Sequence, residues 1–430
     1  MYYSLMNGYK IIDWIRKTNS VDVCKSYLNL IKASGVNHIA KEMQRENLTV
    51  FLSRLRNNDF YSQYLIGISD YEIRNNPYEV IKCFPITDKS FIRANFDKIR
   101  NLVWKGENAY TGGSTGTPFH YVVDKRLLSN MVGFTLFLWH YLAGYNFEDN
   151  VVVVGGTSIG DKKNLKKRLL HYLQKRLFIS GGEINEDNAK ALISLINTAK
   201  HPMVLYGYPS SICEYISLIK RLGLEFDKQK IKSVITTSET LFTHRREKIE
   251  QFFGHKVVNL YGARDSGISS GSLDDNTFIY NGIDCYAENV VYDGMNELVL
   301  TNLHSEAFPF VRYRIGDVAD LSIANKGYPF LLSNLTGRTR DFITLPDGRK
   351  IHGSKINKLF ANQPIGEYQI IQHLGLACDI NIVSAGNINI TKIKEELMSL
   401  LDGVECKITI VDSIPRNKNN KLRNIISEIE

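Results

Sequence analysis

The stretch YTGGSTGTP, at residues 110–118, concentrates glycine and hydroxyl side chains in one short loop. Glycine lets the main chain approach a ligand closely and hydroxyls add hydrogen-bond donors, so such a loop can hold phosphate groups. Gly112, Ser114 and Gly116 also satisfy the G-x-S-x-G pattern of serine hydrolases, in which Ser114 would be the nucleophile. An ordinary turn without a ligand is the third interpretation.

The residues around this loop favour phosphate binding over hydrolysis. A hydrolase elbow needs a helix directly after its serine, whereas Thr117 and Pro118 lead into FHYVVD, whose aromatic and β-branched residues predict a strand. The preceding IRNLVW, residues 99–104, is also strand-like in composition. A Walker A loop needs a lysine directly after its last glycine, and none stands there. If the loop binds ATP, it does so in another family's way.

Length and composition limit the classes of protein that this chain can represent. Its 430 residues, 43% hydrophobic and 11% aromatic, predict at least two domains. The net charge of +8 favours acidic small molecules, nucleotides or phosphates, and no aromatic-rich basic repeat indicates a nucleic-acid partner. The six cysteines include no C-x-x-C pair and the ten histidines no H-E-x-x-H, so neither zinc nor a disulfide framework is indicated. We therefore expect a cytoplasmic protein.

No segment of the sequence predicts an integral membrane span. The first residues are too polar for a signal sequence, and the longest apolar stretch, residues 131–144, is too short to span a bilayer and predicts a buried helix. A basic run at residues 161–176 is typical of a solvated helix face. Peripheral contact with a membrane surface or an anionic ligand is the alternative for that run.

The pattern of apolar residues predicts a large α/β domain followed by a smaller module. Residues 1–75 have helical spacing, and Thr87 or Asp88 could cap the next helix. From 150 to 300, buried strands alternate with helices, and residues 280–335 change to short strands and turns that predict a β-rich subdomain. The last 90 residues contain a hairpin turn at LPDGRK and further strands and a helix, which predict a small α+β domain.

Five motifs fall in one order along the chain: YTGGSTGTP, NLYGARDSG, LVLTNLHSEAFPFVRYRIGD, LTGRTRDF and PRNKNNKLRN. In this order they resemble the adenylate-forming ligases, most of all the phenylacetate-CoA ligase branch and its capsule-cluster relatives. The long segment ending at Asp317 is the most specific. Two further segments also fit: FPITDKSFIRANF, before the first motif, and YGYPSSICEYI, between the first and the second. Residues 1–75 have no comparable match.

The resemblance implies the adenylate-forming fold, with an N-terminal adenylation domain of residues 1–336 and a C-terminal lid of residues 337–430. It also implies a two-step reaction with ATP and magnesium as cofactors. A carboxylate attacks the α-phosphate of ATP and releases pyrophosphate, and the acyl adenylate is then captured by a nucleophile. Charge builds on the phosphate oxygens in the first step, so preorganised donors and cations should stabilise it.

The resemblance assigns roles to individual residues. The phosphate loop would consist of Thr111, Gly112, Gly113, Ser114, Thr115, Gly116 and Thr117. The adenosine would contact Ser238, Glu239, Tyr261, Gly262, Ala263, Asp317 and Arg338, with both ribose hydroxyls donating to Asp317. The catalytic residues would be Lys421, Asp265 and Arg338, with Asp265 positioning magnesium. More weakly, the carboxylic acid would contact Tyr206, Gly207, Tyr208 and Pro209.

Four positions depart from the family's pattern. Asp265 stands where glutamate is usual, so the carboxylate is one methylene shorter, although it keeps the oxygen ligands that magnesium prefers. Asn419 and Asn420 replace the serine and glycine that usually precede the lysine at 421, and Arg340 occupies the hinge position. These departures leave open a non-catalytic nucleotide-binding relative.

The nucleophile is predicted from the start of the lid. GRTRDFITLPDGRKIHGSKI has a polar hairpin and resembles the capsule-cluster relatives, whereas the lid of thioester-forming enzymes begins with a glycine-rich turn. We therefore expect an amine acceptor, in surface-polysaccharide biosynthesis, with a sugar uronic acid as one candidate acid. The alternative is an acyl- or aryl-CoA ligase, whose acceptor is the CoA thiol.

Overall fold

The protein is described here from a computed structural model. The structure describes residues 7–111, 119–155, 169, 171–292, 295–338, 342–361, 363–384, 386–415, 422 and 424–429. Contacts along the chain divide it into two compact units. The first contains residues 1–151, 164–177 and 258–335, and the second contains residues 152–163, 178–257 and 336–430. The domain boundary after residue 336 stays a prediction.

The first unit begins with helices, as the spacing of residues 1–75 predicted. In α3, Leu48, Phe51, Leu52 and Leu55 are buried at intervals of three and four residues, which is the spacing of one helix face. The helices of this region are α1 (Asn7–Arg16), α2 (Ser20–Leu30), α3 (Val36–Leu55), η1 (Tyr61–Leu65), α4 (Asp70–Asn75), α5 (Pro77–Val80), η2 (Ile81–Cys83), α6 (Lys89–Ala94) and α7 (Phe96–Ile99).

These N-terminal helices are tied to a turn at residues 281–284. The Tyr27 hydroxyl donates to Asp284 Oδ2 at 2.6 Å, and the side-chain amides of Gln44 and Asn47 donate to carbonyls of the same turn at 2.6 and 3.1 Å. All of these groups are buried or half-buried, so the hydrogen bonds satisfy polar atoms that would otherwise be orphaned. Helices α2 and α3 therefore fold as an integral part of the first unit.

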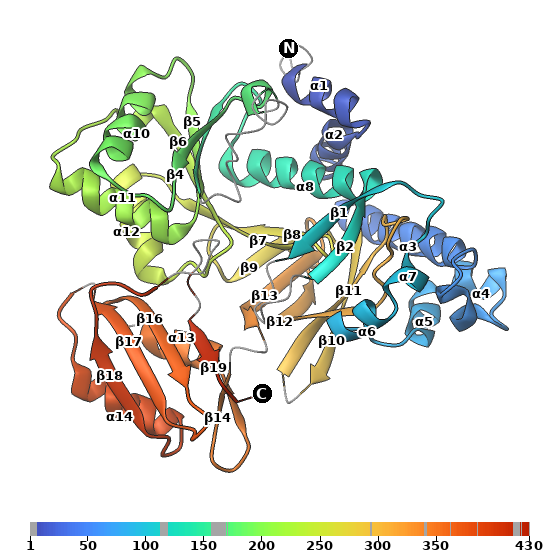
Figure 1. The fold of residues 1–430 in the computed structure, drawn as a ribbon. Coiled ribbons are helices and arrows are strands. Elements are labelled where there is room, and N and C mark those ends of the chain that lie inside the picture. Colours follow the sequence, from blue (N-terminus) through green and yellow to red (C-terminus); the bar gives the residue numbers. More distant parts are fainter. Residues whose placement is uncertain are drawn as a thin grey trace. The chain divides into compact units, whose positions relative to one another are not determined.

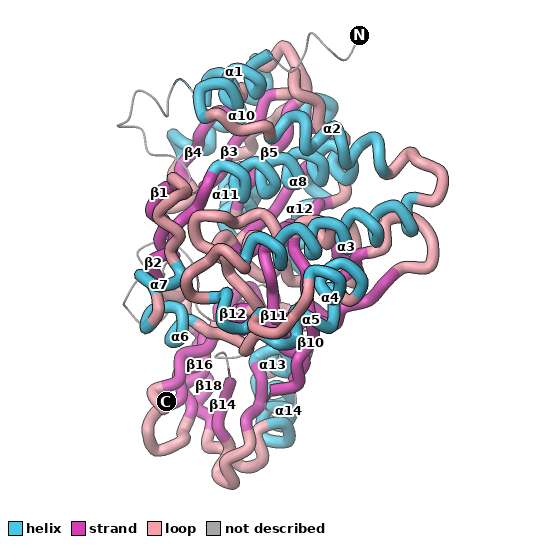
Figure 2. Tube along the Cα trace, turned by 90° about the vertical axis from the view of Figure 1, so that its right-hand side faces the viewer, coloured by secondary structure: helices cyan, strands magenta, loops and turns pink. Residues whose placement is uncertain are grey.

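The apolar stretch at 131–144 forms most of α8 (Lys125–Ala143), the buried helix that the sequence predicts. Asp124 caps its first turn by accepting from the backbone N–H groups of residues 126 and 127. A side chain at Gly133 would lie only 2.5 Å from Val23, so glycine permits the close crossing of α8 and α2, which Figure 2 shows side by side. In the described part of the chain, every helix is too short or too polar to cross a membrane.

The expected strand at IRNLVW, residues 99–104, is wrong. Ile99 ends α7, and the N–H of Val103 donates to Asn101 Oδ1 at 3.1 Å, which closes a turn. An asparagine side chain competes with strand pairing in this way, whatever the propensity of its neighbours. The strand begins later, as β1 (Gly106–Thr111), and pairs antiparallel with β2 (Phe119–Asp124), where the sequence predicts a strand.

The β-rich region at 280–335 is confirmed. In the described part of the first unit the strands run in the order β10-β11-β12-β13-β9-β8-β7, and the β10–β11, β13–β9, β8–β9 and β7–β8 pairs are antiparallel. The strands, all labelled in Figure 1, are β7 (Val257–Ala263), β8 (Ile268–Ser272), β9 (Thr277–Tyr280), β10 (Cys285–Tyr292), β11 (Met295–Asn302), β12 (Tyr313–Ile323) and β13 (Phe330–Arg338).

The sequence predicts alternating strands and helices from residue 150 to 300, but among the described residues from 258 to 300 the structure has strands alone. The alternation is found in the second unit, as far as residue 257. Its strands run in the order β6-β5-β3-β4, and β5 and β6 are parallel. The elements are β3 (Asn150–Gly155), β4 (Arg176–Ser180), α10 (Glu186–Thr198), β5 (Met203–Gly207), α11 (Pro209–Arg221), η3 (Lys228–Lys230), β6 (Ile231–Thr237) and α12 (Thr243–Phe253).

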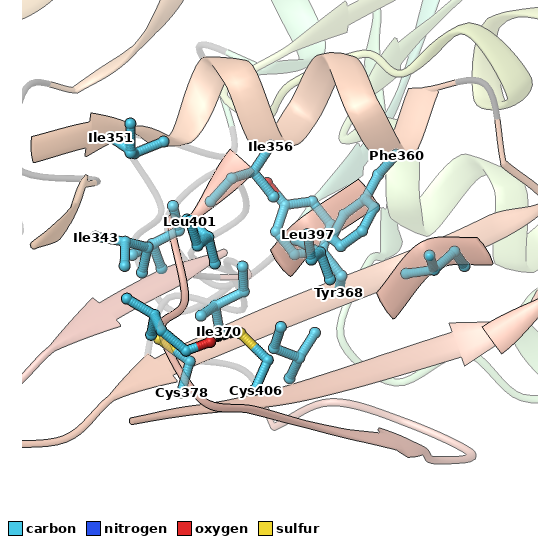
Figure 3. Packing of buried hydrophobic residues seen from close by; sticks show 14 of the residues in the cluster. Ile343, Ile351, Ile356, Phe360, Tyr368, Ile370, Cys378, Leu397, Leu401 and Cys406 are labelled. Carbon is cyan, nitrogen blue, oxygen red and sulfur yellow. Dashed lines mark hydrogen bonds between the residues drawn. The ribbon is translucent and has the colours of Figure 1, made fainter. Parts of the chain in front are cut away.

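The C-terminal residues form the α+β module that the sequence predicts. A hairpin, β14 (Phe342–Thr344) and β15 (Lys350–His352), carries the LPDGRK turn, and a second sheet has the order β18-β17-β16-β19. Tyr368, Ile370, Leu397 and Leu401 pack in its core, together with Phe242 from the segment before α12 (Figure 3). The remaining elements are α13 (Gly353–Ala361), β16 (Ile365–Gln372), β17 (Cys378–Ser384), α14 (Ile390–Leu400), β18 (Cys406–Ile410) and β19 (Ile425–Ser427).

Replacing Asp88 with alanine should destabilise the first unit by about 1 kcal/mol, because an N-cap acceptor is lost. Asp88 Oδ1 accepts from the N–H of Phe91 at 2.8 Å, as the sequence analysis predicts for one of two residues. Thermal and urea unfolding of Asp88→Ala, Asp88→Asn and the parent protein would measure the effect. Asparagine keeps the acceptor, so equal losses in both variants would contradict the capping role.

Candidate active site

The loop predicted to bind phosphate connects the two strands of a hairpin. Thr111 pairs with Phe119, so residues 112–118 close the hairpin between the ends of β1 and β2. Gly112, Gly113, Ser114, Thr115, Gly116 and Thr117 lie outside the described residues. The next helix, α8, begins only at Lys125, after the whole of β2. The strand, nucleophile and helix order of a hydrolase elbow is therefore absent from this described region.

Two hydroxyl groups of the hairpin are buried without a partner among the described residues. Thr111 Oγ1 and the Tyr121 hydroxyl find no hydrogen-bond acceptor or donor among the residues that the structure describes. Burial raises the pKa of Tyr121. The nearby charge of Arg264 lowers this pKa and that of Asp265 raises it, and the effect of burial is the largest. The hydroxyl therefore stays protonated and can donate a hydrogen bond. Orphaned buried donors are uncommon in folded proteins. An anionic ligand held beside this hairpin would satisfy both.

Tyr313 links the end of the loop to the predicted magnesium ligand. The Tyr313 ring lies parallel to that of Phe119, the first residue after the loop, with centroids 6.1 Å apart. Its hydroxyl donates to Asp265 Oδ2 at 3.2 Å, and Asp265 Oδ1 accepts from the N–H of Ser266 at 3.0 Å. Asp265 and Tyr313 are both buried. The Asp265 carboxylate is therefore held in one orientation by a tyrosine that packs against the first residue after the loop.

The segment from Thr87 to Arg93 supplies two cations that the site-residue prediction missed. Thr87 forms a parallel bridge with Tyr313, in which the Thr87 N–H donates to the carbonyl of Arg312 at 2.9 Å. On the helix that follows, Lys89 Nζ and Arg93 Cζ lie 5.8 and 5.9 Å from the centre of the Phe119 ring. The resemblance of FPITDKSFIRANF to the ligases was the only sequence signal for these residues.

The residues predicted to hold the ribose and stack on the adenine lie together. The Tyr261 hydroxyl donates to Asp317 Oδ2 at 2.7 Å, although the two residues are 56 positions apart. Gly262, which follows on β7, pairs with Ser269 of β8, and an added side chain there would lie 2.9 Å from the carbonyl oxygen of Ile268. Glycine is thus required at 262 by packing, and Ala263 ends the strand.

The arginines of the RYR motif have structural partners. Arg312 makes a two-bond ion pair with Glu288, at 3.0 Å for each bond, and also donates to the carbonyl of Phe84 at 2.9 Å. Arg314 lies 3.6 Å from Glu297 and 4.0 Å from the centre of the Tyr292 ring. The two arginines therefore fix the strand that carries Tyr313 and Asp317.

A second group of predicted residues lies in the second unit. Ser238 follows β6 in a left-handed conformation, with φ of 69°, which is strained for a residue with a side chain. Glu239 Oε2 accepts from the N–H of Ser210 at 3.2 Å and lies 3.8 Å from Arg245 Nη1. Arg245 is buried and also pairs with Glu367 of β16 at 3.1 Å. The Glu239 carboxylate is thus part of a buried ion-pair network.

The residues predicted to contact the carboxylic acid form the end of β5 and the start of α11. Gly207 ends the strand, where an added side chain would lie 2.2 Å from the carbonyl oxygen of Val154. Tyr208 and Pro209 are buried, whereas Tyr206 is half-buried. The hydrogen bond between Ser210 and Glu239 holds this turn against the residues that follow β6. The structure therefore brings the two predicted groups of the second unit together.

Two predicted catalytic groups cannot be placed. Lys421 lies outside the described residues, and only the backbone of Arg338 is described, as the last residue of β13. Among the described residues, no group of three or more histidine, cysteine, aspartate or glutamate side chains could hold a metal on its own.

The described residues fit a magnesium ion that is held mainly by a bound nucleotide. Magnesium usually takes one or two carboxylates and completes its octahedral shell with phosphate oxygens and waters. Each oxygen of Asp265 accepts one described hydrogen bond and can accept more. Asp265 would hold the ion, which supplies positive charge to the phosphate oxygens when bound.

Replacing Tyr313 with phenylalanine should raise the magnesium concentration needed for half-maximal activity about fivefold, since one buried hydrogen bond to Asp265 is lost. The ring packing against Phe119 and Phe310 would remain, so the fold should survive. Tyr61→Phe is the matched control, because that buried hydroxyl donates to the carbonyl of Pro309 instead. An equal shift in both variants, or none in Tyr313→Phe, would contradict the assignment.

Proteins with similar sequences include CapK and several ligases. No protein-family model matches the chain. CapK of Staphylococcus aureus is 25% identical over 335 residues, 74% of this chain and 72% of CapK. Phenylacetate-coenzyme A ligase of Pseudomonas putida is 23% identical over 338 residues, covering 73% of this chain and 72% of that ligase. Indoleacetate–lysine synthetase of Pseudomonas savastanoi is 29% identical over 152 residues, 32% of this chain and 34% of the synthetase.

The fold is shared with a solved ligase. A crystal structure of 2-hydroxyisobutyryl-CoA ligase in the postadenylation state matches with a TM-score of 0.65, covering 90% of this chain and 89% of that one at 16% identity. These matches place the chain in the adenylate-forming superfamily. Within this superfamily the chain is similar to CapK and to phenylacetate-coenzyme A ligase, and the predicted fold class is confirmed.

Proposed function

We propose that this ligase uses ATP and magnesium to adenylate a carboxylic acid, with release of pyrophosphate, and transfers the acyl group to an amine in cytoplasmic surface-polysaccharide biosynthesis. The main observation in support of the adenylation step is the pair of contacts that joins Phe119 to Tyr313 and Tyr313 to Asp265. These contacts fix a carboxylate near a hairpin in which the Thr111 and Tyr121 hydroxyls have no partner among the described residues. A bound triphosphate and its cation would match both features.

The contacts of the described site residues support a role for each of them in this reaction. Thr111 and Tyr121 would donate to phosphate oxygens, and Asp265 would hold magnesium in the orientation that Tyr313 sets. Asp317 would accept the ribose hydroxyls, with its position kept by Tyr261. Because these groups are preorganised before the ligand arrives, little reorganisation is needed when charge develops on the phosphates.

The roles of the undescribed residues remain proposals from the sequence. The loop from Gly112 to Thr117 would surround the terminal phosphates with N–H groups, and Lys421 would bridge the α-phosphate and the attacking carboxylate. Arg338 would brace the ribose or the α-phosphate. Ser238 and Glu239 would line the adenine, with the Glu239 carboxylate remaining paired to Arg245.

Two sources support the amine acceptor. The lid begins with the predicted polar hairpin, in which the N–H of Leu345 donates to the carbonyl of Arg349 at 2.7 Å. The name of the similar indoleacetate–lysine synthetase also indicates an acid joined to an amine. Similarity to phenylacetate-coenzyme A ligase supports the CoA thiol as the second candidate. A sugar uronic acid remains one candidate substrate.

Product analysis would distinguish these acceptors. The enzyme would be given its best acid with ATP and magnesium, first without an acceptor and then with CoA or a panel of amines, and the products would be identified by mass spectrometry. We expect an acyl adenylate without acceptor and an amide with an amine. Rapid, saturable thioester formation without any amide would overturn the amine proposal and leave a CoA ligase. Labelling of Ser114 by a fluorophosphonate without ATP would instead indicate a hydrolase.

A further inference from the structure

Helix α1 presents an apolar stripe to solvent. Ile11, Trp14 and Ile15 are spaced as neighbours on one helix face, and they are 43%, 81% and 47% exposed. The opposite face is packed, since Tyr9 and Ile12 are buried. One side of the helix is thus packed, and the other is not covered by described residues. Figures 1 and 2 show α1 next to α2, near the N-terminus.

A neighbouring segment extends this apolar face. A side chain added to Gly8 would lie 2.1 Å from the carbonyl oxygen of Leu173, so the segment before β4 lies directly against the first turn of α1. In that segment Leu169 and Tyr172 are 54% and 79% exposed. The two elements together expose an aliphatic and aromatic face, here called the α1 face: Ile11, Trp14, Ile15, Leu169 and Tyr172.

Exposed basic residues lie on α1 and directly after it. Lys10, Arg16 and Lys17 are exposed. The one acidic residue of the helix, Asp13, turns inward, where its carboxylate accepts from the Thr18 hydroxyl at 2.6 Å and from the N–H of Val21 at 2.8 Å. Asp22 on the next helix lies 3.7 Å from Lys25, so its charge is opposed locally. The charge presented beside the apolar stripe is therefore positive.

We infer that the α1 face docks the enzyme on an anionic lipid surface. A short helix with exposed tryptophan and aliphatic residues on one face and basic residues beside them is the pattern of an interfacial helix. Tryptophan is favoured at the level of the lipid headgroups, and lysine and arginine are attracted to anionic lipids. In self-association through a two-fold axis, a second copy would present the same positively charged face, which like-charge repulsion opposes.

Vesicle flotation tests this inference with the intact protein. The enzyme would be mixed with vesicles of phosphatidylcholine, with or without phosphatidylglycerol as a third of the lipid, at low and high salt. We expect binding only with the anionic lipid, weakened by salt. Trp14→Ser should lower the partition constant roughly tenfold or more, because a large apolar side chain no longer enters the interface. Arg16→Gln with Lys17→Gln should lower it on the order of twentyfold.

Trp104→Ser is the matched control. Trp104 is 50% exposed, follows the exposed Leu102 and Val103, and precedes Lys105, so it offers a rival surface of similar composition. The inference requires that this change leaves vesicle binding intact. Equal losses in Trp14→Ser and Trp104→Ser, or a loss in Trp104→Ser alone, would overturn it. So would an absence of binding to anionic vesicles.

Tryptophan fluorescence gives a second readout that does not depend on activity. The chain contains three tryptophans, and Trp139 is only 2% exposed. In the Trp104→Phe variant, a blue shift of the fluorescence emission on addition of anionic vesicles would therefore report the burial of Trp14. The double variant, Trp14→Phe with Trp104→Phe, should show no such shift. Light scattering in the absence of lipid completes the test. A dimer that Trp14→Ser converts to a monomer would assign the α1 face to self-association and overturn the inference.

Discussion

Lys421→Ala should leave the protein folded and lower the rate of adenylate formation by a factor on the order of 10² to 10³. A cation aimed at the charge that develops in the transition state typically contributes about 3 to 4 kcal/mol in a preorganised site. Lys421 belongs to NNKLRN, the motif that resembles the catalytic-lysine motif of the ligases. The assay is pyrophosphate release with saturating acid and ATP, together with a thermal unfolding scan.

Lys418→Ala is the control, because it removes an equal charge three residues earlier in the same polar stretch. The proposed role requires near-parent activity in Lys418→Ala and parent-like melting temperatures in both variants. Nearly normal adenylation in Lys421→Ala would show that another group supplies the cation. Lys89 and Arg93, beside Phe119, would then be the next residues to test.

Asp317→Ala should weaken ATP binding by about 1.5 to 3 kcal/mol, or roughly ten- to a hundredfold, because the ribose hydroxyls lose a charged acceptor. The affinity for the carboxylic acid should change little. Isothermal titration calorimetry with ATP and, separately, with the acid would measure both.

Tyr261→Phe separates the ribose role from a structural one. This change removes the hydroxyl that donates to Asp317 at 2.7 Å but keeps the carboxylate and the aromatic ring. We expect it to weaken ATP binding by no more than about 1 kcal/mol. If Asp317→Ala left ATP affinity unchanged and only lowered the melting temperature, Asp317 would be a structural partner of Tyr261 and not the ribose acceptor.

The fold could be predicted largely because its buried strands are short, continuous apolar runs. NVVVVG and MVLYG became β3 and β5, and the alternation with helices gave the α/β class. The same reasoning failed at IRNLVW, where Asn101 closes a turn and the apolar residues after it remain exposed. Propensity cannot report whether a partner strand exists.

The sequence predicts the candidate site as a set of residues but not as a network of contacts. Motif order placed Tyr261 and Asp317 in one site, and their hydrogen bond agrees with this. The path from Phe119 through Tyr313 to Asp265 depends on a pairing between distant segments that no local pattern encodes. The pairing of Glu239 with Arg245 was missed for the same reason, since a buried ion pair leaves no periodic signal.

Pyrophosphate exchange tests the central claim most directly. The enzyme would be incubated with ATP, magnesium and labelled pyrophosphate, together with a panel of aryl, fatty, amino and uronic acids. The account predicts that at least one acid supports exchange of label into ATP, that omission of magnesium or acid abolishes it, and that Lys421→Ala greatly reduces it. Tight ATP binding without exchange for any acid in the panel would contradict the account and identify the chain as a nucleotide-binding relative that has lost catalysis.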